Sequence, residues 1–188
     1  MKARSRFALI TTTIAALTLS AMASADMKAN SGTVSFVLPG PIGMTIKGSS
    51  PKLTVAEAGG KIVITVPFLC GHDEDGDVGC FKTGIGLRDR HLIHYAGTKP
   101  AVFSIEKSKL TIPDDGKNAS GKVTGTLELN GTSAPQVINY KVSRAGGEYT
   151  VSGDAIVTLK QFGIEPGYKG VGTGKEATLK LDFKLHDG

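Results

Sequence analysis

Strict alternation of apolar and polar residues is the feature that most constrains how this 188-residue chain folds. It is clearest near the C-terminus, where every second residue from Ala177 to Leu185 is apolar and the residues between them are polar or charged. Successive side chains of a β-strand point to opposite faces, so this pattern predicts a strand with one apolar and one solvent-facing side. Similar alternation recurs in the segments 34–38, 61–68, 103–105, 123–129, 138–142 and 149–159.

Glycine-rich turn signals separate these segments. Gly59-Gly60, Asn130-Gly131 and Gly146-Gly147 favour two-residue hairpin loops, and Asp114-Asp115-Gly116 favours a further turn. About eight strands at short spacing, each with one apolar face, predict an all-β protein whose antiparallel sheet curls into a barrel or sandwich. The sequence shows no internal repeat and no sign of a second domain.

The N-terminal residues have the pattern of a secretory signal peptide. A basic start at Lys2, Arg4 and Arg6 precedes the apolar segment 7–22, and Ala23-Ser24-Ala25 supplies a small-residue cleavage site. Cleavage after Ala25 would leave residues 26–188 as one exported domain, periplasmic or secreted. No other segment approaches the roughly 20 apolar residues that a transmembrane helix needs, so we expect no transmembrane anchor.

Charge and composition narrow the choice of partners. Loss of the three basic residues of the signal peptide would lower the formal net charge from +5 to +2. No block rich in lysine or arginine remains after residue 25, and the aromatic residues are few and scattered, so we expect no nucleic-acid partner. The sequence points to no cofactor, and it leaves the oligomeric state open, a homodimer included.

Both cysteines and three of the four histidines fall between Cys70 and His94. In an oxidising compartment Cys70 and Cys80 are expected to form a disulfide. By the chain-entropy estimate, closing a loop of this size contributes roughly 2.5–3 kcal/mol to stability. We interpret the bond as structural.

The loop between the cysteines carries an acidic run, 73–77, that resembles the start of a calcium-binding loop. Val78 stands where such a loop has its sixth-position glycine, and Gly84 stands where it has its twelfth-position glutamate. We therefore interpret the run as an exposed acidic turn.

The segment Lys82 to Tyr95 departs from strand alternation and is predicted to be a helix of two to three turns over one opening of the barrel. Asp89 near its start and His94 near its end suit the helix dipole.

Two interpretations are open for the charged residues of this helix. Asp89 can pair with an arginine and hold the helix against a loop. Alternatively, Arg88 or Arg90, together with His91, can bind an anionic or polar head group, because the planar guanidinium group binds phosphate or carboxylate through two hydrogen bonds.

Catalytic or metal chemistry has weaker support. His91 and His94 would share one helix face and could bind a metal ion with His72, but the sequence guarantees neither the third ligand nor the surrounding hydrogen bonds. There is no Gly-x-Ser-x-Gly turn and, if the cysteines pair, no free thiol nucleophile. We therefore expect a binding protein without enzyme activity, metal or cofactor.

Two motifs resemble the signatures of the YceI-like family. The first is Thr83-Gly-Ile-Gly-Leu-Arg-Asp-Arg-His-Leu92 followed by Pro100-Ala-Val-Phe-Ser104, and the second is the segment Gly121 to Pro135. The resemblance extends from about Thr33 to His186 and implies an extended, eight-stranded, lipocalin-like antiparallel β-barrel with an apolar tunnel. Some members of the family bind polyisoprenoid chains. The acidic insertion between the cysteines is a departure from the family pattern.

An eight-stranded barrel is just wide enough to fill with side chains or to hold one small ligand. This chain has no tryptophan, and Val, Ile, Leu and Ala dominate its inward-facing set, which favours an open interior. We expect residues 26–188 to hold a polyisoprenoid or similar long apolar amphiphile, with Arg88 and His91 at its head group. The alternative is a solid-core stress-response or protein-interaction module that uses the Cys70–Cys80 loop and the adjacent helix. The predicted apolar lining is Phe36, Phe68, Phe103, Ile138, Tyr140, Leu179 and Phe183.

Overall fold

The computed structural model describes residues 27–29, 32–40, 43–165, 167–168, 171–172 and 174–186. The predicted signal peptide, residues 1–25, lies outside the described residues. The strands are β1 Lys28–Ala29, β2 Gly32–Pro39, β3 Thr45–Ser50, β4 Thr54–Ala58, β5 Lys61–Val66, β6 Leu69–Asp73, β7 Gly76–Gly79, β8 Ala101–Glu106, β9 Asn118–Leu129, β10 Thr132–Ala145, β11 Glu148–Thr158, β12 Gly167–Tyr168, β13 Val171–Gly172 and β14 Glu176–His186. The helices are α1 Gly86–Ala96 and the 3-10 segments η2 Lys107–Lys109 and η3 Leu159–Phe162.

The main sheet closes into an eight-stranded antiparallel barrel. Two of the eight positions in the ring are each shared by two short strands. β1 and β2 share one position beside β14, and β3 and β4 share the next, since β1 pairs with β4 and β2 pairs with β3. The ring continues through β5, β8, β9, β10, β11 and β14. β14 then closes it by pairing with both β2 and β1. The predicted fold class is thus confirmed, and the pairings of β14 with β2 and β1 join the two ends of the sheet.

The hairpin turns form where the glycine pairs predict them. Gly59-Gly60 joins β4 to β5, Asn130-Gly131 joins β9 to β10, and Gly146-Gly147 joins β10 to β11. Both residues of each pair have positive φ, between 53° and 80°. That conformation suits two-residue hairpins because its twist matches that of the flanking strands.

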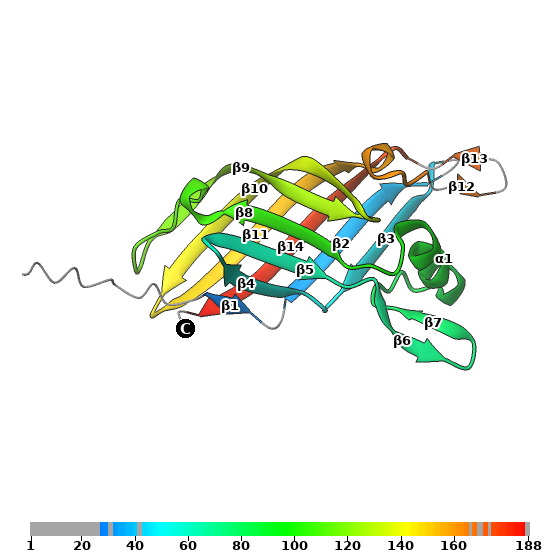
Figure 1. Cartoon of the computed structure of the whole chain (residues 1–188), viewed down its shortest axis with the longest axis horizontal. Helices are drawn as coiled ribbons and strands as arrows, with labels where there is room; N and C mark the ends of the chain where they lie inside the picture. Colours follow the sequence, from blue (N-terminus) through cyan, green and yellow to red (C-terminus); the bar gives the residue numbers. More distant parts are fainter. Residues whose placement is uncertain are drawn as a thin grey trace, which may run out of the picture.

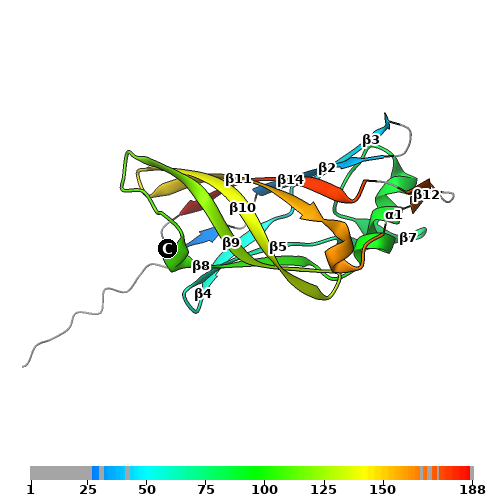
Figure 2. The ribbon, with the colours of Figure 1, turned by 90° about the horizontal axis from the view of Figure 1, so that it is seen from above.

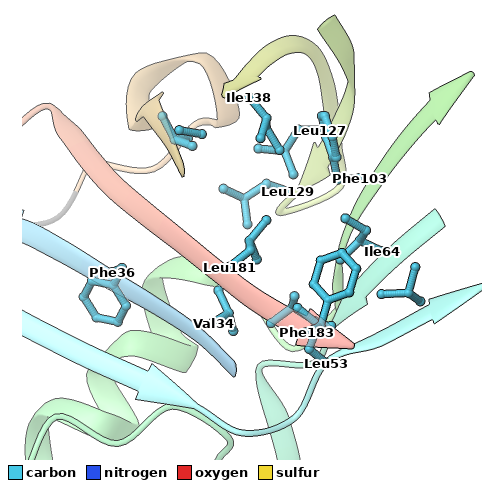
Figure 3. Close-up of a cluster of buried hydrophobic side chains, with 14 of the residues drawn as sticks. Val34, Phe36, Leu53, Ile64, Phe103, Leu127, Leu129, Ile138, Leu181 and Phe183 are labelled. Atoms are coloured by element: carbon cyan, nitrogen blue, oxygen red, sulfur yellow. The ribbon is translucent and has the colours of Figure 1, made fainter. Parts of the chain in front are cut away.

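The alternation of the sequence becomes the inside and outside of the barrel. In β14, Ala177, Leu181, Phe183 and Leu185 are buried, while the residues next to them along the strand are exposed. Figure 3 shows labelled apolar side chains from several strands, such as Phe103 of β8 and Leu181 of β14, extending into one interior.

The two ends of the barrel differ. Helix α1, the β6–β7 hairpin and the β12–β13 hairpin lie at one end of the long axis, and β1 with the C-terminal end of β14 lies at the other (Figures 1 and 2). We call the first the helical end. Among the described residues, no helix is long and apolar enough to span a membrane.

Helix α1 has the predicted length of about three turns and spans Gly86–Ala96, so Lys82 at the start of the predicted segment is not part of it. Lys82 instead forms an isolated β-bridge with Ser49, through backbone hydrogen bonds of 3.1 and 2.8 Å. Thr83 turns toward the helix and donates two hydrogen bonds to Asp89. The backbone of Lys82 is therefore held by β3, and the backbone N–H of Thr83 by the side chain of Asp89 in the helix.

Candidate ligand-binding cavity

The barrel contains a cavity of about 730 Å³. This volume lies within the roughly 300–1,000 Å³ typical of small-molecule sites. Its lining includes the exposed side chains of Met44, Ile85 and Leu87, so it reaches the surface at the helical end. The interior is therefore not the solid core that the alternative interpretation requires. The apolar lining comprises Val34, Phe36, Leu38, Met44, Ile46, Ile64, Val66, Phe68, Phe81, Ile85, Leu87, Leu92, Ala96, Phe103, Leu127, Leu129, Ile138, Ala155, Val157, Leu159, Ile164, Ala177, Leu179 and Leu181.

Three phenylalanines form part of the wall near the opening. The ring of Phe81 packs edge-on against Phe36, with centroids 5.6 Å apart, and is stacked on Phe68 at 5.4 Å. Phe36 in turn lies over the backbone of Gly48, its partner on β3. A Cβ atom at Gly48 would lie 2.5 Å from the Phe36 ring, so glycine is required for this close approach.

A second cavity, of about 80 Å³, lies toward the opposite end of the barrel, where Met27, Tyr149 and Leu185 line it. Ile64, Ile138 and Leu181 line both cavities and therefore separate them. Tyr140 and Phe183 line only the smaller one. The hydroxyl group of Tyr140 also accepts a hydrogen bond from the backbone N–H of Thr111 at 2.9 Å.

The structure thus brings together five of the seven predicted lining residues around the large cavity: Phe36, Phe68, Phe103, Ile138 and Leu179. Tyr140 and Phe183 do not join them. The reason is that alternation predicts whether a side chain points inward, but it does not predict how far along the barrel axis that side chain lies.

Arg88 and His91, predicted to meet the head group, both line the large cavity from helix α1. Arg88 is half-buried and His91 is exposed. Among the described residues, Arg88 has no recorded hydrogen bond or ion pair, so its guanidinium donors are available at the opening. A cationic group beside an apolar cavity suits an amphiphile with a polar or anionic end.

Asp89 holds the start of the helix, but not through an arginine as one interpretation expected. Its buried carboxylate accepts hydrogen bonds from the backbone N–H of Thr83 at 2.7 Å and from the Thr83 hydroxyl at 2.6 Å. The arginine that does form an ion pair is Arg90, which contacts Asp75 of the acidic turn at 3.0 Å. That contact places Arg90 outside the cavity lining.

The three histidines that could have bound a metal ion do not form a site. His72 pairs with Asp77 at 2.7 Å, whereas His94 packs edge-on against Tyr95. His91 lies at the cavity opening. Within the described part of the chain, no group of three or more His, Cys, Asp or Glu side chains is placed to hold a metal ion.

The predicted disulfide is present, with Cys70 and Cys80 joined by an S–S bond of 2.01 Å. It closes the base of the β6–β7 hairpin, where the backbone N–H of Cys80 also donates to the carbonyl of Phe68 at 2.8 Å. Phe68 and Phe81 flank this junction in the sequence. The bond therefore holds together the two chain segments that carry part of the aromatic wall.

We expect replacement of Cys70 and Cys80 by serine to lower the free energy of unfolding by roughly 2.5–3 kcal/mol, because the chain-entropy term of the closed loop is lost. Urea denaturation followed by circular dichroism measures this change. Reduction of the unmodified protein with dithiothreitol should give the same shift. A midpoint that neither treatment moves would show that the hairpin unfolds independently of the barrel.

Phe81 and Gln136 are two of the lining residues that the sequence did not single out. Phe81 lies outside any alternating segment, although its position next to Cys80 was a usable signal once the disulfide was predicted. Gln136 lies two residues before the inward-facing Ile138 on β10, so its side chain points to the same face of the sheet, and it lines the cavity. Gln136 was not predicted to face the interior, because amide side chains are mostly exposed to solvent.

A closed eight-stranded antiparallel barrel with an apolar cavity opening beside a short helix defines a lipocalin-like β-barrel fold. The family model of the YceI-like domain matches residues 75–185, which is more than half of the chain, and the chain belongs to this family.

Two solved structures share the fold. A polyisoprenoid-binding domain from Saccharophagus degradans, implicated in plant cell wall breakdown, superposes with a TM-score of 0.68 at 12% identity, over 87% of this chain and 99% of that one. BcnA of Burkholderia cenocepacia superposes with a TM-score of 0.58 at 17% identity, over 81% of this chain and 95% of that one. None of the curated protein sequences compared with the chain matches it.

Proposed function

We propose that this protein binds a polyisoprenoid or similar long apolar amphiphile in the large cavity, without altering it chemically. The observation that carries the proposal is the cavity of about 730 Å³, with its largely apolar lining and its opening at the helical end. The shared fold with a polyisoprenoid-binding domain supports the same class of ligand.

The energetics favour a long chain over a short one. Burying about ten methylene groups at about 0.8 kcal/mol each gives roughly 8 kcal/mol. Association and ordering then consume at least about 4 kcal/mol of that gain. Micromolar binding corresponds to roughly 8 kcal/mol net, so the ligand must bury more chain than this.

The polar end of the ligand belongs at the opening in this proposal. Arg88 lines the cavity there without a recorded partner among the described residues, and His91 lies one helical turn further along α1. An anionic or polar head group placed between them stays close to water while its chain enters the barrel. The apolar chain of the ligand is then removed from water, whereas its polar head group stays hydrated.

Export is part of the proposal. The signal-peptide pattern of residues 1–25 and the disulfide between Cys70 and Cys80 both support a periplasmic or secreted protein. In such a location the barrel would hold a poorly soluble lipid outside the cytoplasm.

The direct test is to purify the protein from its native compartment without detergent, extract it with organic solvent and identify the released molecules by mass spectrometry. We expect a long-chain amphiphile in stoichiometric amount. A protein that releases no lipid and also takes up no apolar fluorophore when titrated would contradict the proposal.

A further inference from the structure

Gln136 is a buried amide in an otherwise apolar part of the cavity wall. Its side chain is only 8% exposed, and it points inward from β10 between the apolar residues of β9 and β11. The other polar lining residues are Thr45, Arg88, His91 and Tyr95, which lie on β3 or on helix α1 at the helical end. A buried amide among aliphatic side chains is costly unless its polar atoms are used.

Two of its hydrogen-bonding positions are used by the barrel itself. The amide nitrogen Nε2 donates to the backbone carbonyl of Val137 at 2.9 Å and to that of Ile156 at 3.0 Å. Both partners can only accept, so the NH₂ group must point toward them. This determines the orientation of the amide.

The carbonyl oxygen Oε1 is therefore the remaining polar atom of a side chain that lines the cavity. Among the described residues no group donates a hydrogen bond to Oε1, and this atom keeps some solvent-accessible surface. It is thus accessible from the cavity. Oε1 can therefore accept a hydrogen bond only from a donor group of a molecule that enters the cavity.

The place of Gln136 along the barrel is also known. Ile138, two residues further along β10, lines both cavities and so marks the inner end of the large one. Two residues of strand span about 7 Å. Oε1 therefore lies about 7 Å along the strand from that inner end, on the side toward the β9–β10 turn, whereas Arg88 and His91 lie at the opening.

We propose that Gln136 accepts a hydrogen bond from a hydroxyl group at the inner end of the bound chain, a subsite that rests on the proposed function and makes it more specific. A purely hydrocarbon inner end would cover Oε1 and leave a buried acceptor unsatisfied, which is unfavourable. The preferred guests are amphiphiles that carry a hydroxyl group inside the cavity and a second polar group at the opening beside Arg88. A long-chain alcohol with a single hydroxyl group would enter hydroxyl-first, in the orientation opposite to that of a ligand whose only polar end is anionic.

The test compares two ligands that differ in one hydrogen-bond donor. Geranylgeraniol and its methyl ether compete for the cavity with an apolar fluorophore. The ether keeps the chain and the acceptor oxygen but has no O–H group. We expect the wild type to bind the alcohol about tenfold more tightly, the effect of one hydrogen bond to a buried acceptor. In Gln136→Leu the preference for the alcohol should be lost, because the O–H group then has no acceptor.

Two further variants locate the effect. Val137→Ala changes the next side chain on β10, which is exposed on the outer face, and should keep the preference for the alcohol. Arg88→Met should also keep it, because the hydroxyl group lies at the inner end. A preference that Arg88→Met removes, or that Gln136→Leu retains, would place the hydroxyl group at the opening and overturn the proposal.

The outcomes separate this subsite from the function as a whole. Equal binding of the two ligands by the wild type overturns the subsite and leaves lipid binding intact. Binding of neither ligand contradicts the proposed function itself. If Gln136→Leu does not fold, because two backbone carbonyls lose their donor, the wild type and Arg88→Met still decide the question.

Discussion

Replacing Leu179 with tryptophan should weaken the binding of an apolar fluorophore or long-chain lipid by roughly 50-fold. Leu179 lines the large cavity from β14, with Phe36 of β2 on one side and Ala155 of β11 on the other. The larger side chain would extend into space that the ligand needs. If it displaces about three methylene groups of the ligand, the loss is about 2.4 kcal/mol. Fluorescence titration measures the change.

The matched control for this prediction is Thr178→Trp. Thr178 is the preceding residue of the same strand and is exposed on the outer face of the barrel. The Thr178→Trp variant carries the same indole ring on the other side of the sheet. Its affinity for the fluorophore or lipid should therefore equal that of the wild type. Equal affinity in the Leu179 and Thr178 variants would mean that the ligand does not occupy this cavity.

Replacing Phe162 with alanine should lower the free energy of unfolding by about 3–5 kcal/mol, which is the largest stability effect we expect from a single substitution. Phe162 is fully buried, at 0% exposure, in the 3-10 segment η3 between β11 and β14. Its carbonyl accepts a hydrogen bond from the side-chain amide of Asn130 at 3.3 Å. Removing the ring leaves a void beneath the β9–β10 turn.

Urea denaturation measures this loss, and an unchanged slope of the transition would show that only stability has changed. Ile156→Ala is the control, because Ile156 is 61% exposed on the outer face of β11 and its truncation should change stability by no more than about 0.5 kcal/mol. A Phe162 variant as stable as this control would mean that η3 does not contribute to the cooperative unit of the barrel.

The local features of the fold follow from the sequence because they depend on neighbouring residues. The strict alternation of 177–185 places its apolar side chains inside the barrel, and the Asn130-Gly131 pair forms the predicted turn. The bond between Cys70 and Cys80 needs only proximity and an oxidising environment. These outcomes are decided by backbone geometry over a few residues.

The composition of the site depends on packing between distant segments, and here the sequence predicted less. Lys82 was expected in the helix, but it pairs with Ser49 of the adjoining strand. Asp89 was expected to meet an arginine, but it accepts hydrogen bonds from Thr83. For Lys82, a partner made available by the closed barrel competed with the local preference for helix. For Asp89, the backbone and hydroxyl group of a residue six positions earlier took the place of the arginine.

Which face each strand turns inward, where the chain reverses and which cysteines pair were all encoded in the order of the residues alone. Only the closed barrel decided which inward side chains share one cavity: it placed Leu179 in the large cavity, Phe183 in the small one, and the free acceptor of Gln136 toward the interior. The physical reason is that alternation is a property of one strand. A cavity arises from the register of eight strands and from the space that their side chains together leave unfilled.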